Sequence, residues 1–579
     1  MGEYMIKPTK KNLPIESEQK PNQLQRSQPR KEKTAAQIVE EYIKPIEIQI
    51  DFIPDKCVQL HELFRDGVLD NKINAKLLAA ACHQLQDGEN IFTPIMKSFS
   101  TVPLDEVKLI FEETTADIQN GNVYLVESYE KELKMLIQAN NMSAIGFTKN
   151  KRSRHYYFNA NIFVKYMMSR VTIVLAEGNF VLYNHHRGLY VTVDDVLIGK
   201  VIRFLMHEVK NDIWTSSYEA EILKALLLEV PIIEAFNPDN KYLNVENGML
   251  NIYTLSLTNH SPDFYSNVRV PISYDEEEKC KLFERVIDEI TQGDKSLINV
   301  IQEIFGYCLI AGIKAEKAFM FFGSGSNGKS LIANILIALV GMNNVSTIPL
   351  KQFSEQFGLE GLIGKALNIA TENEVSHMKM NTESLKAIIS GDPINIQRKY
   401  KTSVRYTPTC KLLFLVNTLP DTWDNTYGFY RKIEIIPFRR KFTDEDKDID
   451  LFNKLKLELP GILNWSIIGL RRLIANHYKF SNSEAIEDMK REYEEEQNPV
   501  LKFYNNCLLP RKGVSVSKRD VLAAYNDWIA VNSIDDKGTR SNQKFWKMFK
   551  LALDKYGKKY AEKKVNGYMY LLDMTLSID

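Results

Sequence analysis

One eight-residue segment constrains this chain more than any other. Residues 323–330 read GSGSNGKS, a full match to the pattern GxxxxGK[ST], and they lie between the apolar runs FMFF and LIANILIALV. A strand that passes through such a loop into a helix is typical of phosphate-binding loops, because the glycines let backbone amides approach phosphate oxygens and the helix N-terminus adds positive potential. The sequence therefore predicts an α/β domain with a nucleotide site.

The predicted ATP-binding residues are the eight members of this loop, Gly323, Ser324, Gly325, Ser326, Asn327, Gly328, Lys329 and Ser330. In loops of this kind the lysine reaches the β- and γ-phosphates and the hydroxyl of the last residue coordinates Mg²⁺. We therefore expect ATP and Mg²⁺ as cofactors, with Lys329 as a catalytic residue and Ser330 as a ligand of the nucleotide-bound metal.

Polar residues follow two later apolar strands. The strand predicted over residues 366–370 leads into Glu372 and Glu374, and the strand over residues 412–416 leads into Asn417. An acid at such a strand end can bind Mg²⁺ and polarise the attacking water, and an amide can orient that water. Glu372 is the principal candidate acid and Asn417 the water-orienting residue, whereas Glu374 is equally well explained as an exposed loop residue.

A basic hairpin is predicted between these two strands. The segments INIQRKYK and SVRYTP have the pattern of two strands around a tight turn, with Arg398, Lys399, Lys401 and Arg405 close to the turn. Such a hairpin can grip a nucleic-acid backbone. A charged edge hairpin that lysines keep soluble is the alternative.

An arginine that acts on a neighbouring subunit's nucleotide is predicted further along. Arg431 lies just before the apolar strand KIEIIPF, and Arg439 follows it. An arginine supplied by a second subunit stabilises the charge of phosphoryl transfer and makes hydrolysis depend on assembly. The sequence does not separate Arg431 from Arg439 for this role.

The order of these motifs resembles the superfamily 3 helicase core of phage, plasmid and poxvirus-type primase-helicases, a branch of the AAA+ ATPases. The motifs are GSGSNGKS, NIATENE, SLKAIISGDPINIQRKYK, LLFLVNTLP and YRKIEIIPF, and the upstream segment YLNVENGMLNIYTLSLTNHSPDF is similar to the segment before the ATPase in that family. Within the family, the motifs resemble in particular those of the replication initiator helicases of staphylococcal pathogenicity islands and the related helicases of staphylococcal cassette chromosomes. The resemblance implies a Walker B role for Glu372, a sensor 1 role for Asn417, an arginine finger at Arg431 and a hexamer.

Two positions depart from the family pattern. Lys432 stands where relatives have the second of two arginines, and Thr371 stands where many have a first acidic residue. The N-terminal part also contains no DxD and no zinc motif, which argues against a primase activity in this chain. A separate primase and host replication proteins are therefore the partners that the resemblance implies.

The 579 residues are too many for one hydrophobic core. Composition and periodicity predict a multidomain α/β protein with six parts: a disordered tail (1–34), a helical N-terminal domain (35–149), an α+β domain (150–279), the AAA+ core (280–455), a helical linker (456–499) and a C-terminal winged-helix domain (500–579). No run of 18 apolar residues occurs, and the first residues lack a signal peptide, so we expect a cytoplasmic protein with no membrane partner. The resemblance to staphylococcal helicases implies that the cytoplasm is bacterial.

The C-terminal part concentrates positive charge in a chain whose 74 basic and 74 acidic residues otherwise balance. Residues 511–568 carry fourteen lysines and arginines against six acidic residues, a net charge of +8. The stretch TRSNQKFWKMFKLAL places Phe545, Phe549 and Leu553 on one helical face, and Asn566-Gly567 signals a tight turn. We predict a recognition helix and a wing that contact DNA through Arg540, Lys544, Lys547 and Lys550.

Three functions are compatible with these features. An ATP-dependent DNA helicase would initiate replication of a mobile genetic element by binding its origin duplex and unwinding it as a ring around one strand. An origin-binding ATPase switch would assemble on DNA and recruit a separate helicase, and would not need the basic hairpin. A signalling or scaffolding ATPase would not need the basic C-terminal part.

Overall fold

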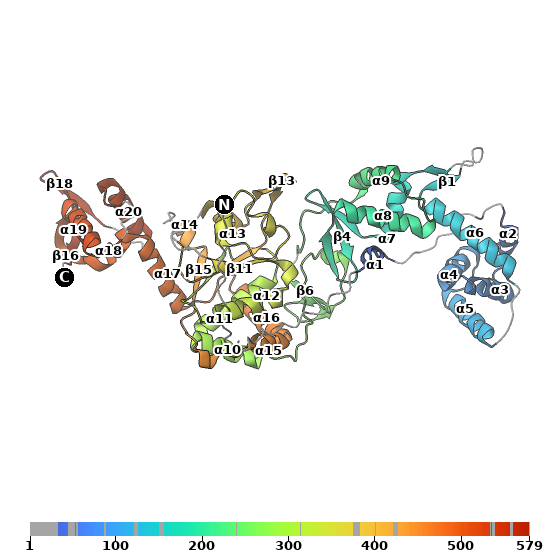
Figure 1. The fold of residues 1–579 in the computed structure, drawn as a ribbon, viewed down its shortest axis with the longest axis horizontal. Helices are drawn as coiled ribbons and strands as arrows, with labels where there is room; N and C mark the ends of the chain where they lie inside the picture. The colour runs from blue at the N-terminus through green and yellow to red at the C-terminus, as the bar shows by residue number, and fades with distance from the viewer. Residues whose placement is uncertain are drawn as a thin grey trace, which may run out of the picture. The chain divides into compact units, whose positions relative to one another are not determined.

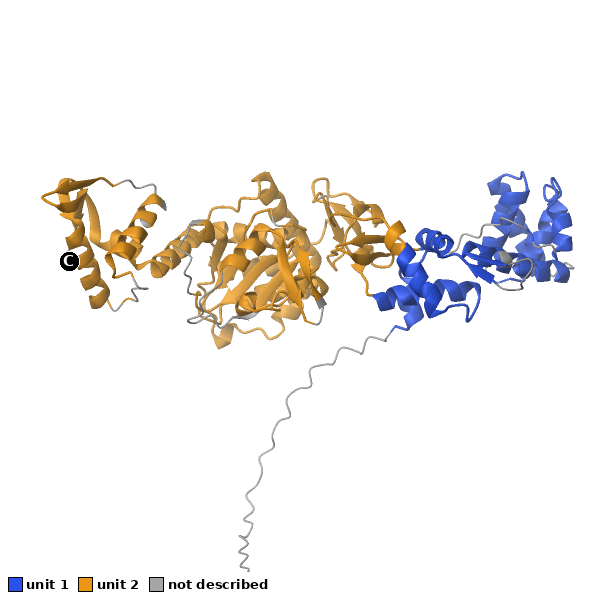
Figure 2. Ribbon diagram, turned by 90° about the horizontal axis from the view of Figure 1, so that it is seen from above, with its two compact units in different colours: residues 1–170, 195–225 blue, residues 171–194, 226–579 orange. Residues whose placement is uncertain are grey.

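The computed structural model describes residues 33–44, 53, 56–85, 88–120, 126–149, 156–238, 240–312, 314–373, 382–399, 401–420, 427–532, 534, 539–555 and 560–577. The chain forms two compact units, residues 1–170 with 195–225 and residues 171–194 with 226–579 (Figure 2). The predicted disordered tail lies outside the described residues except for Lys33 and Thr34.

The first unit is mainly helical, as its apolar periodicity predicts. Its helices are α1 (Ala35–Glu40), α2 (Val58–Leu63), α3 (Lys72–His83), α4 (Gly88–Phe99), α5 (Leu104–Gln119), α6 (Glu127–Ala144), α7 (Ala160–Arg170) and α8 (Asp195–Val209). The short strands β1 (Phe147–Lys149) and β2 (Tyr156–Phe158) pair antiparallel. Helix α9 (Ser216–Glu229) crosses from this unit into the second.

The second unit begins with two small antiparallel sheets. Strands β3 (Ile173–Ala176), β4 (Asn179–Asn184) and β5 (Leu189–Thr192) form one, and β6 (Tyr242–Val245), β7 (Gly248–Asn251) and β8 (Leu257–Thr258) form the other. Both sheets lie within residues 150–279, the part of the chain that is predicted to be an α+β domain.

A five-stranded parallel sheet forms the centre of the second unit. Its strands are β10 (Val345–Ser346), β11 (Leu367–Asn373), β14 (Lys411–Val416), β9 (Ala318–Phe322) and β15 (Ile433–Pro437), in this order across the sheet. Alternate residues of β9 and β14 face opposite sides, with Phe319 and Leu413 in one hydrophobic core and Met320 and Phe414 in the other. The sheet is thus covered on both faces, which parallel sheets require.

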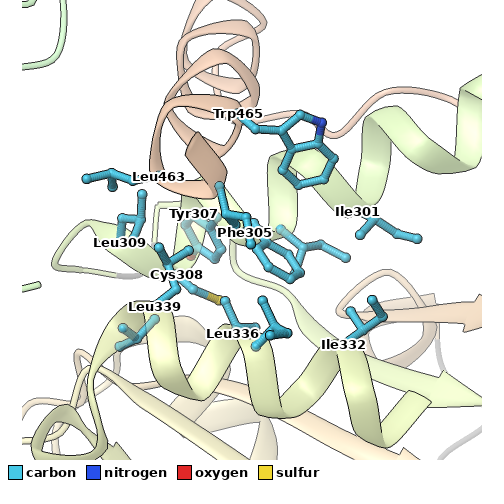
Figure 3. Packing of buried hydrophobic residues seen from close by; sticks show 14 of the residues in the cluster. Ile301, Phe305, Tyr307, Cys308, Leu309, Ile332, Leu336, Leu339, Leu463 and Trp465 are labelled. Carbon is cyan, nitrogen blue, oxygen red and sulfur yellow. The ribbon is translucent and has the colours of Figure 1, made fainter. Parts of the chain in front are cut away.

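Helices α10 (Lys281–Thr291), α11 (Lys295–Leu309), α12 (Lys329–Val340), α15 (Leu451–Leu457) and α16 (Leu459–Ala475) contribute to the core on one face. In Figure 3, Trp465 of α16 and Phe305 of α11 point into this core above Ile332 and Leu336 of α12, and the rings of Trp465 and Phe305 are 5.6 Å apart. The stretch predicted as a helical linker therefore begins with a helix that is packed against α11.

Shorter elements cover the other face. Helices α13 (Thr382–Ser390), α14 (Tyr427–Tyr430) and α17 (Glu484–Gln497) contribute buried residues to its core, together with the hairpin of β12 (Ile394–Arg398) and β13 (Lys401–Tyr406) (Figure 1). Strand β11 is longer than predicted. It continues to Asn373, so Glu372 lies within its last residues rather than after its end.

The C-terminal residues have their own core. The elements run α18 (Pro499–Cys507), β16 (Leu508–Ser517), α19 (Lys518–Val531), α20 (Asn542–Lys555), β17 (Glu562–Val565) and β18 (Tyr568–Leu576), and the strands form a sheet in the order β16-β18-β17. The apolar periodicity of this part of the chain predicts three consecutive helices and then a hairpin. A strand, β16, separates the first two, and the alternation in GVSVS is its only sequence signal.

Among the helices of the described residues, none combines the length and the apolar character that crossing a bilayer requires.

Candidate nucleotide site

The phosphate loop has the backbone conformation that its glycines allow. Gly325 and Gly328 have φ values of +103° and +82°, in the region that favours glycine, and Ser326 has a φ of +49°. Gly328 caps the N-terminus of α12, so the backbone amides of the first turn of this helix face the end of strand β9. The loop therefore presents amide donors at the carboxyl edge of the sheet.

A polar cluster forms around the ammonium group of Lys329. The Nζ atom donates to the side-chain oxygens of Asn327 and Asn417, each at 3.1 Å, and to the backbone carbonyl of Gly323. Only 5% of Lys329 is exposed, and burial lowers its pKa. Among the described residues, the acceptors of this ammonium group are three neutral oxygens, and a bound phosphate would supply negative charge.

Asn417 reaches the loop because of the strand order. Strand β14 lies between β9 and β11, and Val416 at its end is in register with Phe322 at the end of β9. The loop lysine and Asn417, separated by 88 positions in sequence, therefore meet at one edge of the sheet. The predicted proximity of Asn417 to the phosphates is consistent with this geometry.

The acidic residues are described less completely. The backbone of Glu372 lies in β11, at the same edge of the sheet and next to β14, but its side chain is not among the described ones. Glu374 lies outside the described residues. Ser330, in the first turn of α12, is exposed. A serine hydroxyl and a carboxylate are oxygen donors of the type that Mg²⁺ prefers, so this pair suits the metal of an Mg–ATP complex.

The two candidate arginines lie beyond opposite ends of strand β15, Arg431 before its amino end and Arg439 after its carboxyl end. Arg431 is exposed and precedes β15, whose first residue, Ile433, is in register with the start of β9. The five residues of β15 span roughly 17 Å, and this length separates Arg431 from the loop of its own chain. Arg439 is also exposed but follows β15, at the edge where the loop lies.

Lys432, which replaces the second arginine of the family pattern, is buried. Its ammonium donates to Glu316 Oε2 at 2.7 Å and to Ser390 Oγ at 2.6 Å. Glu316 and Ser390 come from the loop before β9 and from the end of α13. Lys432 therefore links the start of β15 to the loop before β9 and to the end of α13. The sequence did not predict this structural role.

The basic hairpin has the predicted form. Arg398 is in register with Lys401 at the turn end, and Ile396, in the middle of β12, is 1% exposed and lies in the core. Arg405, predicted close to the turn, is instead in register with Asn395, toward the end remote from the turn. Lys399 and Arg405 are exposed, Arg398 is half-buried, and the side chain of Lys401 is not described. The hairpin thus carries positive charge away from the core that anchors it.

In the C-terminal domain, helix α20 buries the predicted apolar face. Phe545, Phe549 and Leu553 lie in the domain core, and Arg540, Lys544, Lys547 and Lys550 are exposed. The turn between β17 and β18 has positive φ values at Asn566 and Gly567, as predicted for a tight hairpin turn. Lys518, at the start of α19, links this helix to β17 and α20. Its ammonium pairs with Glu562 of β17 at 2.7 Å and lies 4.1 Å from the ring centre of Trp546 of α20.

Two family models and several proteins of known name are similar to parts of this chain. A family model described as D5 N terminal like matches residues 160–292, and the model of a family of unknown function, DUF5906, matches residues 321–432, from the end of β9 to the start of β15. A protein of Acanthamoeba polyphaga mimivirus that is named as a helicase is 26% identical over 244 residues, which are 40% of this chain and 25% of that protein. A protein of Invertebrate iridescent virus 3, also named as a helicase, is 22% identical over 389 residues, 60% of this chain and 39% of that one.

The chain thus spans less than half the length of these viral relatives. Among solved structures, the C-terminal region of NrS-1 matches with a TM-score of 0.41 and 11% identity, over 70% of this chain and 96% of that one. A second structure of this region matches with a TM-score of 0.42 and 12% identity, over 72% and 100% of the two chains. The sequence similarities are thus to the D5 N terminal like family model and to viral proteins that are named as helicases.

Proposed function

We propose that this chain is an ATP-dependent DNA helicase that initiates replication of a mobile genetic element. The observation that carries the proposal is the hydrogen bond between Lys329 Nζ and Asn417 Oδ1, at 3.1 Å, at the carboxyl edge of the parallel sheet. It joins the phosphate loop to a polar residue on the strand between β9 and β11, which is the arrangement that ATP hydrolysis needs. The viral relatives named as helicases favour DNA as the substrate on which this ATPase acts.

In the proposed reaction the loop residues bind the triphosphate. Lys329 stabilises charge on the β- and γ-phosphates, Ser330 and Glu372 coordinate the Mg²⁺ ion that accompanies ATP, and Asn417 orients the attacking water. The negative charge of phosphate oxygens around the ammonium group would favour its charged form and so oppose the lowering of the Lys329 pKa by burial. Binding of the nucleotide is therefore coupled to the charge state of this lysine.

The proposed active form is a ring, with a hexamer as the expectation from superfamily 3 of the AAA+ ATPases. Arg431 is exposed at the sheet edge remote from its own loop, so it is available only to the nucleotide of another subunit. Arg439 is excluded from this role in the proposal because it lies at the edge of its own loop. Such a head-to-tail contact closes into a ring when its rotation closes.

Two basic surfaces would contact DNA in this proposal. The hairpin of β12 and β13 would hold a single strand through Arg398, Lys399 and Lys401. The C-terminal domain, with the order helix, strand, helix, helix, hairpin, would act as a winged helix on origin duplex through Arg540, Lys544, Lys547 and Lys550. A separate primase and host replication proteins would complete initiation.

The alternative is an origin-binding ATPase switch that recruits a separate helicase. The two proposals differ in what the hairpin does, so its lysines are the place to test them. We would follow ATP hydrolysis and separation of a forked DNA duplex in the same samples, for the unchanged chain, Lys329→Ala, and Lys399→Ala with Lys401→Ala. The control removes two exposed lysines elsewhere, Lys281→Ala with Lys479→Ala.

The helicase proposal requires that the hairpin variant loses unwinding but keeps hydrolysis without DNA, that Lys329→Ala loses both, and that the control loses neither. If the unchanged chain hydrolyses ATP but separates no fork, the switch replaces the helicase. If the unchanged chain does not hydrolyse ATP, both proposals fail.

A further inference from the structure

The segment after β15 lies along the phosphate loop. The N–H of Phe438 donates to the carbonyl of Phe322 at 2.8 Å, and the N–H of Phe442 donates to the carbonyl of Ser326 at 2.7 Å. Between them, the side-chain amide of Asn327 donates to the carbonyl of Phe438 at 3.2 Å. These bonds fix residues 438–442 beside the loop, on the side where β15 flanks β9.

The contacts of Lys329 on the β14 side of the loop indicate in which direction a bound nucleotide would extend. Lys329 marks where the β- and γ-phosphates lie, and its ammonium points to Asn417 on β14. Strands β14 and β11 lie on one side of β9, and β15 lies on the other. With the γ-phosphate toward β14, the α-phosphate, sugar and base extend toward β15 and therefore toward residues 438–442.

An aromatic ring and a guanidinium group lie where the base would emerge. Phe442 is half-buried, and its Cε2 atom is 3.7 Å from the position that a Cβ atom would take at Gly328. The guanidinium carbon of Arg440, an exposed residue, lies 5.4 Å from the ring centre of Phe442. Ile290 of α10 packs on the same side of Gly328, with its Cδ1 atom 2.6 Å from that Cβ position.

We propose that Phe442 and Arg440 form a platform that binds the base and the α-phosphate of the nucleotide, with the ring stacking against the base and the guanidinium contacting the α-phosphate. This inference rests on the proposed nucleotide site. A ring face senses the stacking area of a base and not its hydrogen-bonding edge, because every base has a π-face. The platform therefore favours purine over pyrimidine nucleotides and separates ATP from GTP only weakly.

The test compares hydrolysis of ATP, GTP and CTP by the full chain. We expect Phe442→Leu to raise KM for ATP and GTP about tenfold while kcat changes little, and to erase the preference over CTP. Phe442→Tyr retains the ring and should retain both KM and preference. Arg440→Gln, at an exposed position, should raise KM for all three nucleotides by a similar factor.

The matched control is Phe452→Leu. Phe452 packs against the same core as Phe442 and also has a cation over its ring, with Lys456 Nζ at 5.9 Å, but it belongs to α15 and lies outside residues 438–442. This variant should leave the KM values unchanged. Melting curves of all variants report whether each has folded, and Arg440→Gln still tests the platform if Phe442→Leu does not fold.

Unchanged KM values in Phe442→Leu or in Arg440→Gln, with hydrolysis that still depends on Lys329, would overturn the platform and leave the ATPase intact. An equal rise in Phe452→Leu would also overturn it. Absence of hydrolysis in the unchanged chain would instead refute the proposed function, so the two failures are distinguishable.

Discussion

At the scale of single residues, the contact between Lys329 and Asn417 is the one that, in our proposal, connects the phosphate loop to the attacking water. Asn417 is an uncharged acceptor for Lys329, so its removal leaves the positive charge that attracts the triphosphate in place and should weaken ATP binding little. We expect Asn417→Ala to lower kcat for ATP hydrolysis about 100-fold, the effect of losing one preorganised polar group, while KM changes less than threefold. Steady-state kinetics with ATP measures both constants.

The control for this variant is Asn505→Ala, which removes an exposed amide that pairs with Glu495 at 2.8 Å and lies in α18. It should leave both constants unchanged. A kcat for Asn417→Ala within threefold of the unchanged chain would exclude Asn417 from the reaction.

The residues of the loop could be predicted from sequence, because a contiguous motif fixes its own local backbone. Asn417 could be predicted only as a polar residue at a strand end, and its contact with Lys329 depends on which strands are neighbours. The contact of the buried Lys432 with Glu316 and the placement of residues 438–442 have no sequence signal, because both arise from contacts between distant segments.

At the scale of elements, a buried lysine joins β14 to the end of α11. Lys411 is 1% exposed, its ammonium donates to the carbonyl of Ile310, and it lies 5.4 Å from the ring centre of Tyr307. Burial lowers the pKa of Lys411 to about 8. The positive charge lies beside the carbonyl end of a helix, where the helix dipole favours it.

This pKa predicts how stability depends on pH. The pKa of a lysine in the unfolded chain is about 10.4, so between pH 8 and 10 the unfolded state binds more protons than the folded state and stability rises with pH. Relative to Lys411→Met, the unchanged chain should gain about 2 kcal/mol over this range. Amide hydrogen exchange of β14 and α11 measures the local effect, because a multidomain chain does not unfold in one transition.

The comparison with Lys411→Met removes the contribution of other groups. Cys308 and Cys410 lie nearby, and burial raises the pKa of each thiol to about 12, so they lower stability as the pH rises above 9. These thiols are present in both proteins. A difference between the two proteins that is constant from pH 8 to 10 would show that Lys411 does not change its charge there.

A second prediction at this scale concerns helix α20. Lys547 and Lys550 are exposed on the helix that buries Phe545 and Phe549, so their removal should not disturb the core. If each contacts one phosphate, Lys547→Ala with Lys550→Ala should reduce the slope of log affinity against log salt concentration by about 2. Titration of labelled duplex at several salt concentrations measures this slope.

The exposed lysines Lys281 and Lys479 provide the control for charge alone. Replacing both by alanine should leave the salt slope unchanged. An equal change in both variants would indicate nonspecific attraction to total charge and would remove α20 from the DNA-binding surface.

The elements themselves could be predicted to different degrees. The apolar runs of β9, β14 and β15 and the periodicity of α20 predict their types, because burial on both faces or on one face leaves a clear pattern. Strand β16 contains Pro510, Arg511, Lys512 and Gly513 and pairs irregularly between Pro510 and Ser515, so its sequence resembles a loop. Pairing with β18 supplies the hydrogen bonds that make it a strand.

At the scale of the whole molecule, the sheet order makes each chain incomplete for hydrolysis in our proposal. The loop and Asn417 lie at the carboxyl edge, and Arg431 lies at the other. The sequence predicts both sets of residues but not this separation, because the register of β15 against β9 decides it. A subunit that lacks Arg431 would keep a working loop, and a subunit that lacks Lys329 would keep a working arginine.

Mixing these two defective chains tests the arrangement. Arg431→Ala and Lys329→Ala should each lower hydrolysis about 1,000-fold or more, since an arginine in trans contributes 10³ to 10⁵ in kcat. In an equimolar mixture, about a quarter of the interfaces of a head-to-tail ring combine an intact loop with an intact arginine, so about a quarter of the unchanged activity should return. Hydrolysis measured against mixing ratio should peak near equal amounts.

Arg439→Ala provides the contrast, because Arg439 lies at the edge of its own loop. Any defect of this variant acts within one chain, so mixing it with Lys329→Ala should restore nothing beyond its own residual rate. Failure of Arg431→Ala to be rescued, in mixtures that light scattering shows to be assembled, would place its action within one subunit. Since β15 separates Arg431 from its own loop, such a result would also require a rearrangement of the start of β15, and it would remove the reason for a ring.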